Sequence, residues 1–426
     1  MSLTRDLAGS LVLGGIRLSD LARDVGTPAY VYDLDGIAAA ARALHDALRP
    51  ALHLVAYAVK ANAAGAVVRT LADQGCGADV VSGAELRVAL ACGIAPDRIV
   101  YSGVAKLDEE LDLALACGAQ GIAAIQIESV EEIARVEARA RVAGRRARIG
   151  IRINPSIDLG DATHAHIATG HDVAKFGVPA ADVVNAVRHV EASEWLRLVG
   201  MAAHVGSKLP SVEPYLASAR VLFRTVRDLR EAAALRSLEF VDTGGGFAVD
   251  YGEGPVPPPA DFVRAVRTEQ KAFGLADLPL YLEPGRALVA PFGVLLARVI
   301  QKKETTAARW LMIDAGMNDL LRPALYQARH RIVALELPPG AKAARAWRVV
   351  GPVCESSDDF GEHELPAEPP AHVAILDAGA YGYTMASCYN GRQLPVEVFL
   401  RDGKAIGKTH RVAAEVWAAE RSRAGG

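Results

Sequence analysis

The sequence of 426 residues has few cysteines, no long apolar run and no marked excess of one charge. Its five cysteines are scattered and lack CxxC spacing, which argues against a disulfide framework and a structural zinc site. The formal net charge of −3 provides no basic field for nucleic acid. Apolar stretches such as 54–59 are too short to cross a bilayer, and no signal peptide is evident. These absences predict a cytoplasmic protein without a membrane or nucleic-acid partner.

The middle of the chain has the sequence pattern of an α/β protein. Between residues 50 and 285, short β-rich runs alternate with longer helical patterns, which predicts a parallel sheet with crossover helices. Eight such runs fit the count and size of a (β/α)8 barrel, with a doubly wound open sheet as the alternative. The runs are 53–59, 78–81, 98–101, 121–127, 148–153, 198–204, 237–241 and 279–282.

Beyond residue 286 the long helical patterns mostly disappear. Strand-like runs at 286–299, 309–314, 346–350, 373–376 and 395–400 predict a C-terminal antiparallel β domain. The early run 29–33 is a candidate to join it. We therefore predict an N-terminal segment at 1–49 that partly joins the β domain, a barrel at 50–285 and the β domain at 286–426.

In a (β/α)8 barrel the active site lies at the C-terminal ends of the strands, so the residues that follow each predicted strand carry the chemistry. Polar and glycine residues gather at these positions: Lys60, Asp79, Arg152, Asn154, His204, Ser207, Gly244, Gly245, Gly246, Glu283 and Arg286. Packing alone does not require this convergence. It predicts a site at one rim of the barrel.

Each of these residues also has an ordinary structural interpretation, as a solvated lysine, a flexible turn or a loop carboxylate. Lys60, however, follows an apolar strand, where burial would lower its pKa as imine chemistry requires. The run Gly244–Gly246 would let backbone N–H groups approach a phosphate, and Ser207 would add a hydroxyl. Glu283 could keep a pyridine nitrogen protonated, and the flat ring of His204 could face a cofactor ring. Together they predict pyridoxal 5′-phosphate (PLP), held by Lys60 as a Schiff base.

At this point a family resemblance becomes specific. The motifs Tyr57-Ala-Val-Lys-Ala-Asn62, His204-Val-Gly-Ser207, Gly244-Gly-Gly246 and Glu283-Pro-Gly-Arg286 resemble those of the alanine-racemase-like (fold-type III) PLP decarboxylases. Downstream, Asn318-Asp-Leu-Leu-Arg-Pro-Ala-Leu-Tyr326, Cys354-Glu-Ser-Ser-Asp358 and Gly379-Ala-Tyr381 are similar to the diaminopimelate decarboxylase family. The resemblance runs from about Thr27 to Val398 and keeps the family's motif order.

The resemblance implies PLP-dependent decarboxylation of meso-2,6-diaminopimelate to L-lysine and CO2, and a role for each matching residue. Lys60 is the implied Schiff-base lysine and Cys354 the implied acid. The family is homodimeric, with the Cys354–Glu355 segment reaching into the partner's site. The implied cofactor residues are Lys60, Asp79, Arg152, His204, Ser207, Gly244, Gly245, Gly246, Glu283, Gly285, Arg286 and Tyr381. The implied substrate residues are Arg286, Arg322, Tyr326, Glu355 and Tyr381.

The chemistry suits a substrate with two amino-acid ends. A distal carboxylate fits a bidentate arginine such as Arg322 or Arg286, and Glu355 could accept from the distal ammonium. The alternatives are a related decarboxylase of ornithine, lysine, arginine or carrier-bound glutamate, an amino-acid racemase, and a PLP-carrying regulatory barrel.

Two features depart from or fall outside the family pattern. Lys208 replaces the glutamine that the family usually carries and adds a cation near the rim. His164, His166 and His171 lie close together in the sequence but fit no standard ligand spacing, so we predict no metal there.

Overall fold

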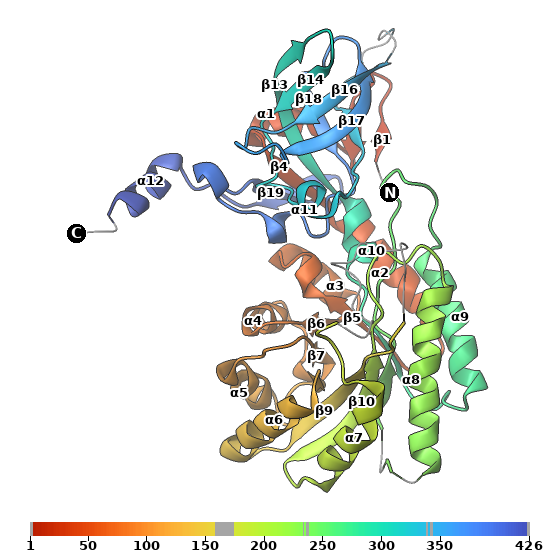
Figure 1. Cartoon of the computed structure of the whole chain (residues 1–426). Coiled ribbons are helices and arrows are strands. Elements are labelled where there is room, and N and C mark those ends of the chain that lie inside the picture. Colours follow the sequence, from red (N-terminus) through yellow and green to blue (C-terminus); the bar gives the residue numbers. More distant parts are fainter. Residues whose placement is uncertain are drawn as a thin grey trace. The chain divides into compact units, whose positions relative to one another are not determined.

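The computed structural model describes residues 3–157, 174–232, 234–235, 238–337, 340 and 344–423. The chain forms two compact units (Figure 1). The barrel unit contains Ala40–Ala248 and Val256–Ala287. The β-sheet unit contains Met1–Ala39, Val249–Pro255 and Leu288–Gly426.

The barrel unit is built on a closed barrel of parallel strands, in the order β10-β11-β12-β5-β6-β7-β8-β9. Parallel pairing of β12 with β5, which aligns Leu280 with His53, closes the circle. The strands are β5 (His53–Ala58), β6 (Gly77–Val80), β7 (Ile99–Tyr101), β8 (Ala124–Ile127), β9 (Ala147–Ile153), β10 (Leu196–Ala203), β11 (Phe240–Asp242) and β12 (Leu280–Leu282). The predicted barrel is therefore confirmed, and the open sheet is excluded.

Helices between successive strands surround this barrel (Figure 1). Local sequence sets several of their ends: the hydroxyls of Ser82 and Ser129 accept from the N–H groups of Glu85 and Glu132, as N-cap residues do. The helix α6 ends at Gly144 in the left-handed conformation, which glycine adopts without strain. The helices are α3 (Gly65–Asp73), α4 (Gly83–Ala91), α5 (Asp108–Ala116), α6 (Val130–Ala143), α7 (Val183–Ala192), α8 (Glu213–Glu231) and α9 (Pro259–Ala272).

The β-sheet unit has the strand order β17-β16-β14-β13-β4-β19-β20, and β18 pairs with both β13 and β15. Strand β4, far upstream in the sequence, lies between β13 and β19. Most pairs are antiparallel, but β14 pairs with β16 and β4 with β19 in parallel, so the sheet is mixed. The strands are β4 (Ala29–Asp33), β13 (Gly293–Glu304), β14 (Arg309–Ile313), β15 (Ile332–Ala334), β16 (Ala344–Val350), β17 (Asp359–Pro366), β18 (His372–Ile375), β19 (Val396–Arg401) and β20 (Lys404–Lys408).

The predicted strand at 286–299 is wrong in its first half. That segment starts as the helix α10 (Arg286–Val289), continues as the 3-10 turn Ala290–Phe292, and becomes strand only at β13. A short apolar run fits a buried helix as well as a buried strand, so periodicity could not separate the two. The remaining elements include β1 (Thr4–Arg5), β2 (Leu11–Leu13), β3 (Ile16–Arg17), α1 (Leu18–Val25), α2 (Leu34–Leu48), α11 (Arg322–Tyr326) and α12 (Ala414–Ser422).

A hydrophobic core holds the helix α1 against the sheet of the β-sheet unit. Leu18 and Leu21 of the helix pack with Val31 of β4 and Val294 and Leu296 of β13. Among the residues that the structure describes, none of the helices combines the length and apolar character needed to cross a bilayer.

Candidate active site

Lys60 stands at the end of the first barrel strand, within the 3-10 turn Val59–Ala61. Its Nζ donates to Oδ2 of Asp79 at 2.5 Å, and the parallel register of β5 and β6 places Asp79 opposite Ala58. The Asp79 carboxyl is fully buried, whereas the Lys60 side chain is 41% exposed. Lys60 is therefore only partly buried. A buried counter-ion positions its amine instead.

The glycine run after β11 is required by close packing. A Cβ at Gly244 would lie 2.4 Å from Nδ1 of His204, and one at Gly245 would lie 2.2 Å from the carbonyl oxygen of Glu283. Gly244 and Gly246 also have φ values of +70° and +98°, which side chains rarely allow. Only glycines can therefore bring this backbone so close to the ends of β10 and β12.

The segment after β10 adds a ring, a hydroxyl and a cation to the glycine run. Nδ1 of His204 accepts from the Gly245 N–H at 3.1 Å, so this nitrogen carries no proton. Burial, with smaller contributions from Arg152 and Lys60, holds the pKa of His204 well below its usual value. Ser207 Oγ accepts from Nη2 of Arg286 at 2.9 Å. The ring is therefore neutral, and a guanidinium and a hydroxyl stand in the segments that pack with the glycine run.

Gly285 allows the segment after β12 to pack closely against the turn after β5. A Cβ there would lie 3.0 Å from Cβ of Ala61 and 3.1 Å from Cβ of Ala58. The N–H of Ala58 donates to the carbonyl of Pro284 at 3.1 Å. The Glu283–Arg286 segment is thus held directly against the turn that carries Lys60.

Three carboxyls converge from β6, β11 and β12: Asp79, Asp242 and Glu283. Burial, followed by the neighbouring carboxylates, raises the pKa of Glu283, and burial raises that of Asp242. Within the described part of the chain, Oδ1 of Asp79, Oδ2 of Asp242 and Nη2 of Arg152 are buried without a hydrogen-bond partner. Buried polar atoms normally find partners, so these atoms mark a place for a polar ligand.

Glu128 was not predicted from the sequence. It follows β8 directly, is almost fully buried, and accepts from Nη1 of Arg152 at 3.2 Å. Its two oxygens also accept from the N–H groups of Gly103 at 2.8 Å and Gly177 at 2.9 Å. Its position, as the first charged residue after the fourth strand, is the sequence feature that could have revealed it.

In the β-sheet unit, Arg322 begins α11 and is fully buried. Its Nη1 donates to Nε2 of His330 at 2.7 Å, and its guanidinium lies 4.7 Å from the ring centroid of Tyr251. Nδ1 of His330 lies 2.8 Å from the carbonyl oxygen of Leu376. A guanidinium only donates, so His330 accepts through Nε2 and carries its proton on Nδ1.

The other predicted substrate residues of this unit occupy loops or helix ends. Cys354 and Glu355 are exposed: the Cys354 N–H donates to Oδ1 of Asn390 at 2.9 Å, and Tyr389 donates to Oε1 of Glu355 at 2.5 Å. Tyr326 ends α11. Tyr381 has a φ of +56°, an uncommon backbone conformation for a residue other than glycine.

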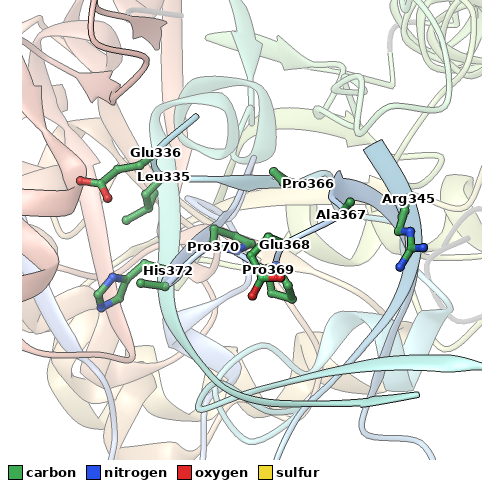
Figure 2. A pocket seen from close by; sticks show the side chains of 10 residues that line it. Leu335, Glu336, Arg345, Pro366, Ala367, Glu368, Pro369, Pro370 and His372 are labelled. Carbon is green, nitrogen blue, oxygen red and sulfur yellow. The ribbon is translucent and has the colours of Figure 1, made fainter. Parts of the chain in front are cut away.

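The β-sheet unit contains two cavities near these segments or apart from them. A cavity of about 730 Å³ between Leu335, Arg345 and the 366–372 connection contains none of the predicted site residues (Figure 2). Another, of about 930 Å³, is lined by Pro323 and Ala324 of α11 and by Ser356 and Ser357. It therefore borders both predicted substrate segments.

The structure offers no metal site in the part it describes, where no group of three His, Cys, Asp or Glu side chains could hold an ion. The cluster His164, His166 and His171 lies outside the described residues.

The sequence matches the pyridoxal-binding domain of the pyridoxal-dependent decarboxylases over residues 34–290, more than half of the chain. The barrel and its site thus define a pyridoxal-dependent decarboxylase, and PLP is its cofactor. Similarity that extends over nearly the whole chain identifies the family within this class. The chain is 40% identical over 402 residues to a diaminopimelate decarboxylase from Zymomonas mobilis, covering 93% of each chain. It is 39% identical to one from Pseudomonas fluorescens, covering 97% of each. The chain belongs to the diaminopimelate decarboxylase family.

Solved structures agree with this assignment. Diaminopimelate decarboxylase from Helicobacter pylori, complexed with L-lysine, is 35% identical, with a TM-score of 0.87, and the match covers 95% of this chain and 100% of that one. The lysine/ornithine decarboxylase from Vibrio vulnificus has a TM-score of 0.74 at 22% identity, over 90% and 97% of the two chains, which shows a shared fold.

Proposed function

We propose that the protein decarboxylates meso-2,6-diaminopimelate to L-lysine and CO2, the last step of lysine biosynthesis. One observation carries this proposal: the similarity to diaminopimelate decarboxylases continues through the β-sheet unit, where Arg322 and Glu355 stand. The H. pylori relative is complexed with L-lysine, the product of this reaction.

The barrel residues fit the cofactor. When bound, PLP supplies an electron sink for the bond that breaks at the substrate Cα. We assign Lys60 as the residue that holds PLP covalently, with Asp79 as its counter-ion. Gly244, Gly245 and Gly246, with Ser207 and Arg286, provide backbone N–H groups, a hydroxyl and a guanidinium for the phosphate. His204 would face the ring and Glu283 would pair with its nitrogen, and we assign Arg152, Gly285 and Tyr381 to the same cofactor.

The β-sheet unit supplies recognition of the distal end. The rigidly held guanidinium of Arg322 suits the second carboxylate of the substrate, because arginine pairs with carboxylates through two parallel N–H bonds. Glu355 accepts from the distal ammonium, and Tyr326, Tyr381 and Arg286 contact the remainder of the substrate. L-Lysine and L-ornithine lack the second carboxylate and would leave Arg322 without that partner.

Substrate choice is tested by measuring CO2 release from meso-diaminopimelate, L-lysine, L-ornithine and L-arginine. The expected result is a preference for diaminopimelate of at least about 10²-fold in kcat/KM, since only this substrate brings a second carboxylate to pair with Arg322. A preference for any of the other three would replace this proposal by a sister decarboxylase. Racemisation of the substrate without CO2 release would place the chain in a different enzyme class.

We further propose that Cys354 gives the proton that replaces CO2, and that it does so in the partner's site of a homodimer. The exposure of Cys354 and Glu355 supports this, because a segment that serves another subunit must be accessible. Lys60→Ala and Cys354→Ala variants, each inactive alone, should regain about a quarter of the activity on mixing, because half of randomly formed dimers carry one intact site. No recovery would show that each chain uses its own cysteine.

A cytoplasmic location is also proposed, in keeping with the substrate and with reduced cysteines. Cell fractionation tests it, and recovery of the protein with membranes or outside the cell would contradict it.

A further inference from the structure

The loop 351–358 joins β16 to β17, and its tip carries Cys354 and Glu355, which are exposed. The N–H of Gly351 donates to the carbonyl of Asp358 at 3.1 Å, so the two ends of the loop are joined. Exposed loops are usually among the more mobile parts of a fold. A loop whose tip carries reacting groups therefore needs contacts that fix the tip itself.

The carboxylate of Asp358 provides two such contacts from inside the loop. This residue is almost fully buried. Its Oδ2 accepts from the N–H of Val353, next to Cys354, at 2.6 Å, and its Oδ1 accepts from the N–H of Met317 at 2.7 Å. An ionised carboxylate accepts through both oxygens, whereas an amide has an NH2 group in place of one of them. Asp358 thus ties the loop to the segment that leads to Arg322 and α11.

Two glycines make room for this carboxylate. A Cβ at Gly351 would lie 2.4 Å from both Asp358 oxygens, and one at Gly316 would lie 3.0 Å from Oδ2. Backbone from the loop and from the segment before α11 therefore packs directly around the Asp358 side chain. Such close packing leaves the carboxylate little freedom to change its partners.

Asn390 binds the tip of the loop from a separate segment. Its Oδ1 accepts from the N–H of Cys354 at 2.9 Å, and the neighbouring Tyr389 donates to Oε1 of Glu355 at 2.5 Å. Asn390 has a φ of +56°, in the left-handed region that asparagine adopts more readily than most residues. The backbone turn at Asn390 therefore suits the residue whose side chain accepts from Cys354.

We propose that Asp358 and Asn390 are positioning residues that fix the loop tip so that Cys354 and Glu355 reach the substrate in one defined geometry. The inference rests on the proposed function, in which Cys354 gives the proton and Glu355 accepts from the distal ammonium. Neither positioning residue touches the substrate. Each acts through the backbone N–H of Val353 or Cys354.

The main test compares the holoenzymes of Asp358→Asn and Asp359→Asn, well below their thermal midpoints, by CO2 release from meso-diaminopimelate. Asp359 is the matched control, because its carboxylate accepts from the N–H of Gly361 and from Arg348, away from the loop tip. Asp358→Asn loses one of two buried acceptors, so kcat/KM should fall roughly 10- to 100-fold while PLP affinity stays within about threefold. Asp359→Asn should stay within about twofold of the unaltered protein.

A second pair of variants tests the contact to Cys354. Asn390→Gly keeps the left-handed backbone and removes only the side-chain acceptor, so kcat/KM should fall roughly five- to tenfold. Asn390→Asp keeps an oxygen at the Oδ1 position and should recover most of the activity. Should Asp358→Asn fail to fold, Asn390→Gly decides, and unchanged kinetics there would overturn the proposal.

The double variant Asp358→Asn/Glu355→Gln shows whether the effect passes through the loop tip. If Asp358 acts by placing Glu355, the KM of the double variant should exceed that of Asp358→Asn by no more than about threefold. Losses that multiply would overturn the proposal, as would equal kinetics in Asp358→Asn and Asp359→Asn. A lower thermal midpoint with unchanged kcat/KM would show a merely structural role.

The Glu355→Gln variant alone separates failure of this inference from failure of the proposed function. An unchanged KM for diaminopimelate in that variant would contradict the assignment of Glu355 to the distal ammonium. The kcat values of Asp358→Asn and Asn390→Gly would then decide whether the loop is positioned for Cys354, and unchanged values in both would overturn the inference.

Discussion

The barrel unit and the β-sheet unit both bury charged side chains, but they satisfy them differently. In the barrel, Asp79 on β6 and Arg152 on β9 each keep a buried atom without a protein partner in the described residues. In the β-sheet unit, Arg322 is bonded to His330 and stacked on Tyr251, while Glu397 accepts from Tyr32. The barrel therefore leaves polar atoms of Asp79 and Arg152 available for a cofactor, whereas Arg322 and Glu397 bond to side chains of their own unit. Four experiments would test this contrast.

The largest effect should follow a change at Lys60. Lys60→Ala should abolish the absorbance near ~420 nm that lysine-bound PLP gives and lower kcat by at least about 10²- to 10⁴-fold. Lys60→Arg is the matched control, because it keeps a cation for Asp79 but cannot hold PLP covalently. A band that persists in either variant would assign the cofactor to another lysine.

Glu397 tests whether a buried charge of the β-sheet unit serves stability alone. Burial raises its pKa to about 7 from a usual value of 4.5, although Tyr32 donates to its Oε1 at 3.0 Å. Between these pH values the folded protein binds the proton and the unfolded chain does not, so stability falls as pH rises. Glu397→Gln should remove this dependence, worth about 3 kcal/mol between pH 4.5 and 8, without changing kcat.

Thermal midpoints of Glu397→Gln and the unaltered protein, recorded from pH 4.5 to 8, measure the effect. Parallel pH profiles for the two proteins would show that Glu397 is ionised in the fold throughout.

His330 tests whether the fixed position of Arg322 matters for the substrate. His330→Ala leaves the buried guanidinium without its acceptor and should raise the KM for diaminopimelate by roughly 10- to 100-fold, with a smaller change in kcat. His330→Gln can still accept from Arg322 and should recover most of the affinity. PLP binding should stay unchanged in both variants, so a loss of cofactor would contradict the assignment of Arg322 to substrate alone.

The smallest effect should come from Glu128, which holds Arg152 and two loop N–H groups. Glu128→Gln keeps a carbonyl acceptor but loses the charge opposite Arg152, so PLP should bind roughly tenfold more weakly. The KM for the substrate should not move. A change in KM with intact PLP affinity would mean that Glu128 shapes the substrate path.

Much of the barrel could be predicted because the sequence patterns that indicate it lie within short segments of the chain. Lys60, Asp79, His204 and Glu283 each follow an apolar run, and strand ends of a parallel barrel meet at one rim whatever the intervening helices contain. Glu128 and Asp242 were missed although they occupy equivalent positions. Their positions directly at strand ends could have marked them as candidates, but residue type alone does not separate a carboxylate that binds a neighbour from one that is solvated.

The strand pairing and the site residues of the β-sheet unit were harder to predict from the sequence. Its sheet pairs β4 with strands that follow the whole barrel in sequence, and the parallel pairs β14–β16 and β4–β19 leave no distinctive local pattern. Arg322 was found only through the family motif, since arginines in loops are usually solvated. Its partners His330 and Tyr251 come from distant segments.

The sequence by itself determined the eightfold strand–helix alternation, the PLP motifs and the family, because these depend on residue type, spacing and order. The tertiary structure alone decided how the charges are satisfied: Lys60 is partly buried beside a fully buried Asp79, and Arg322 contacts His330 and the ring of Tyr251. Such pairings arise between strands and loops far apart in the chain, and the energy of a buried charge depends on what surrounds it in space.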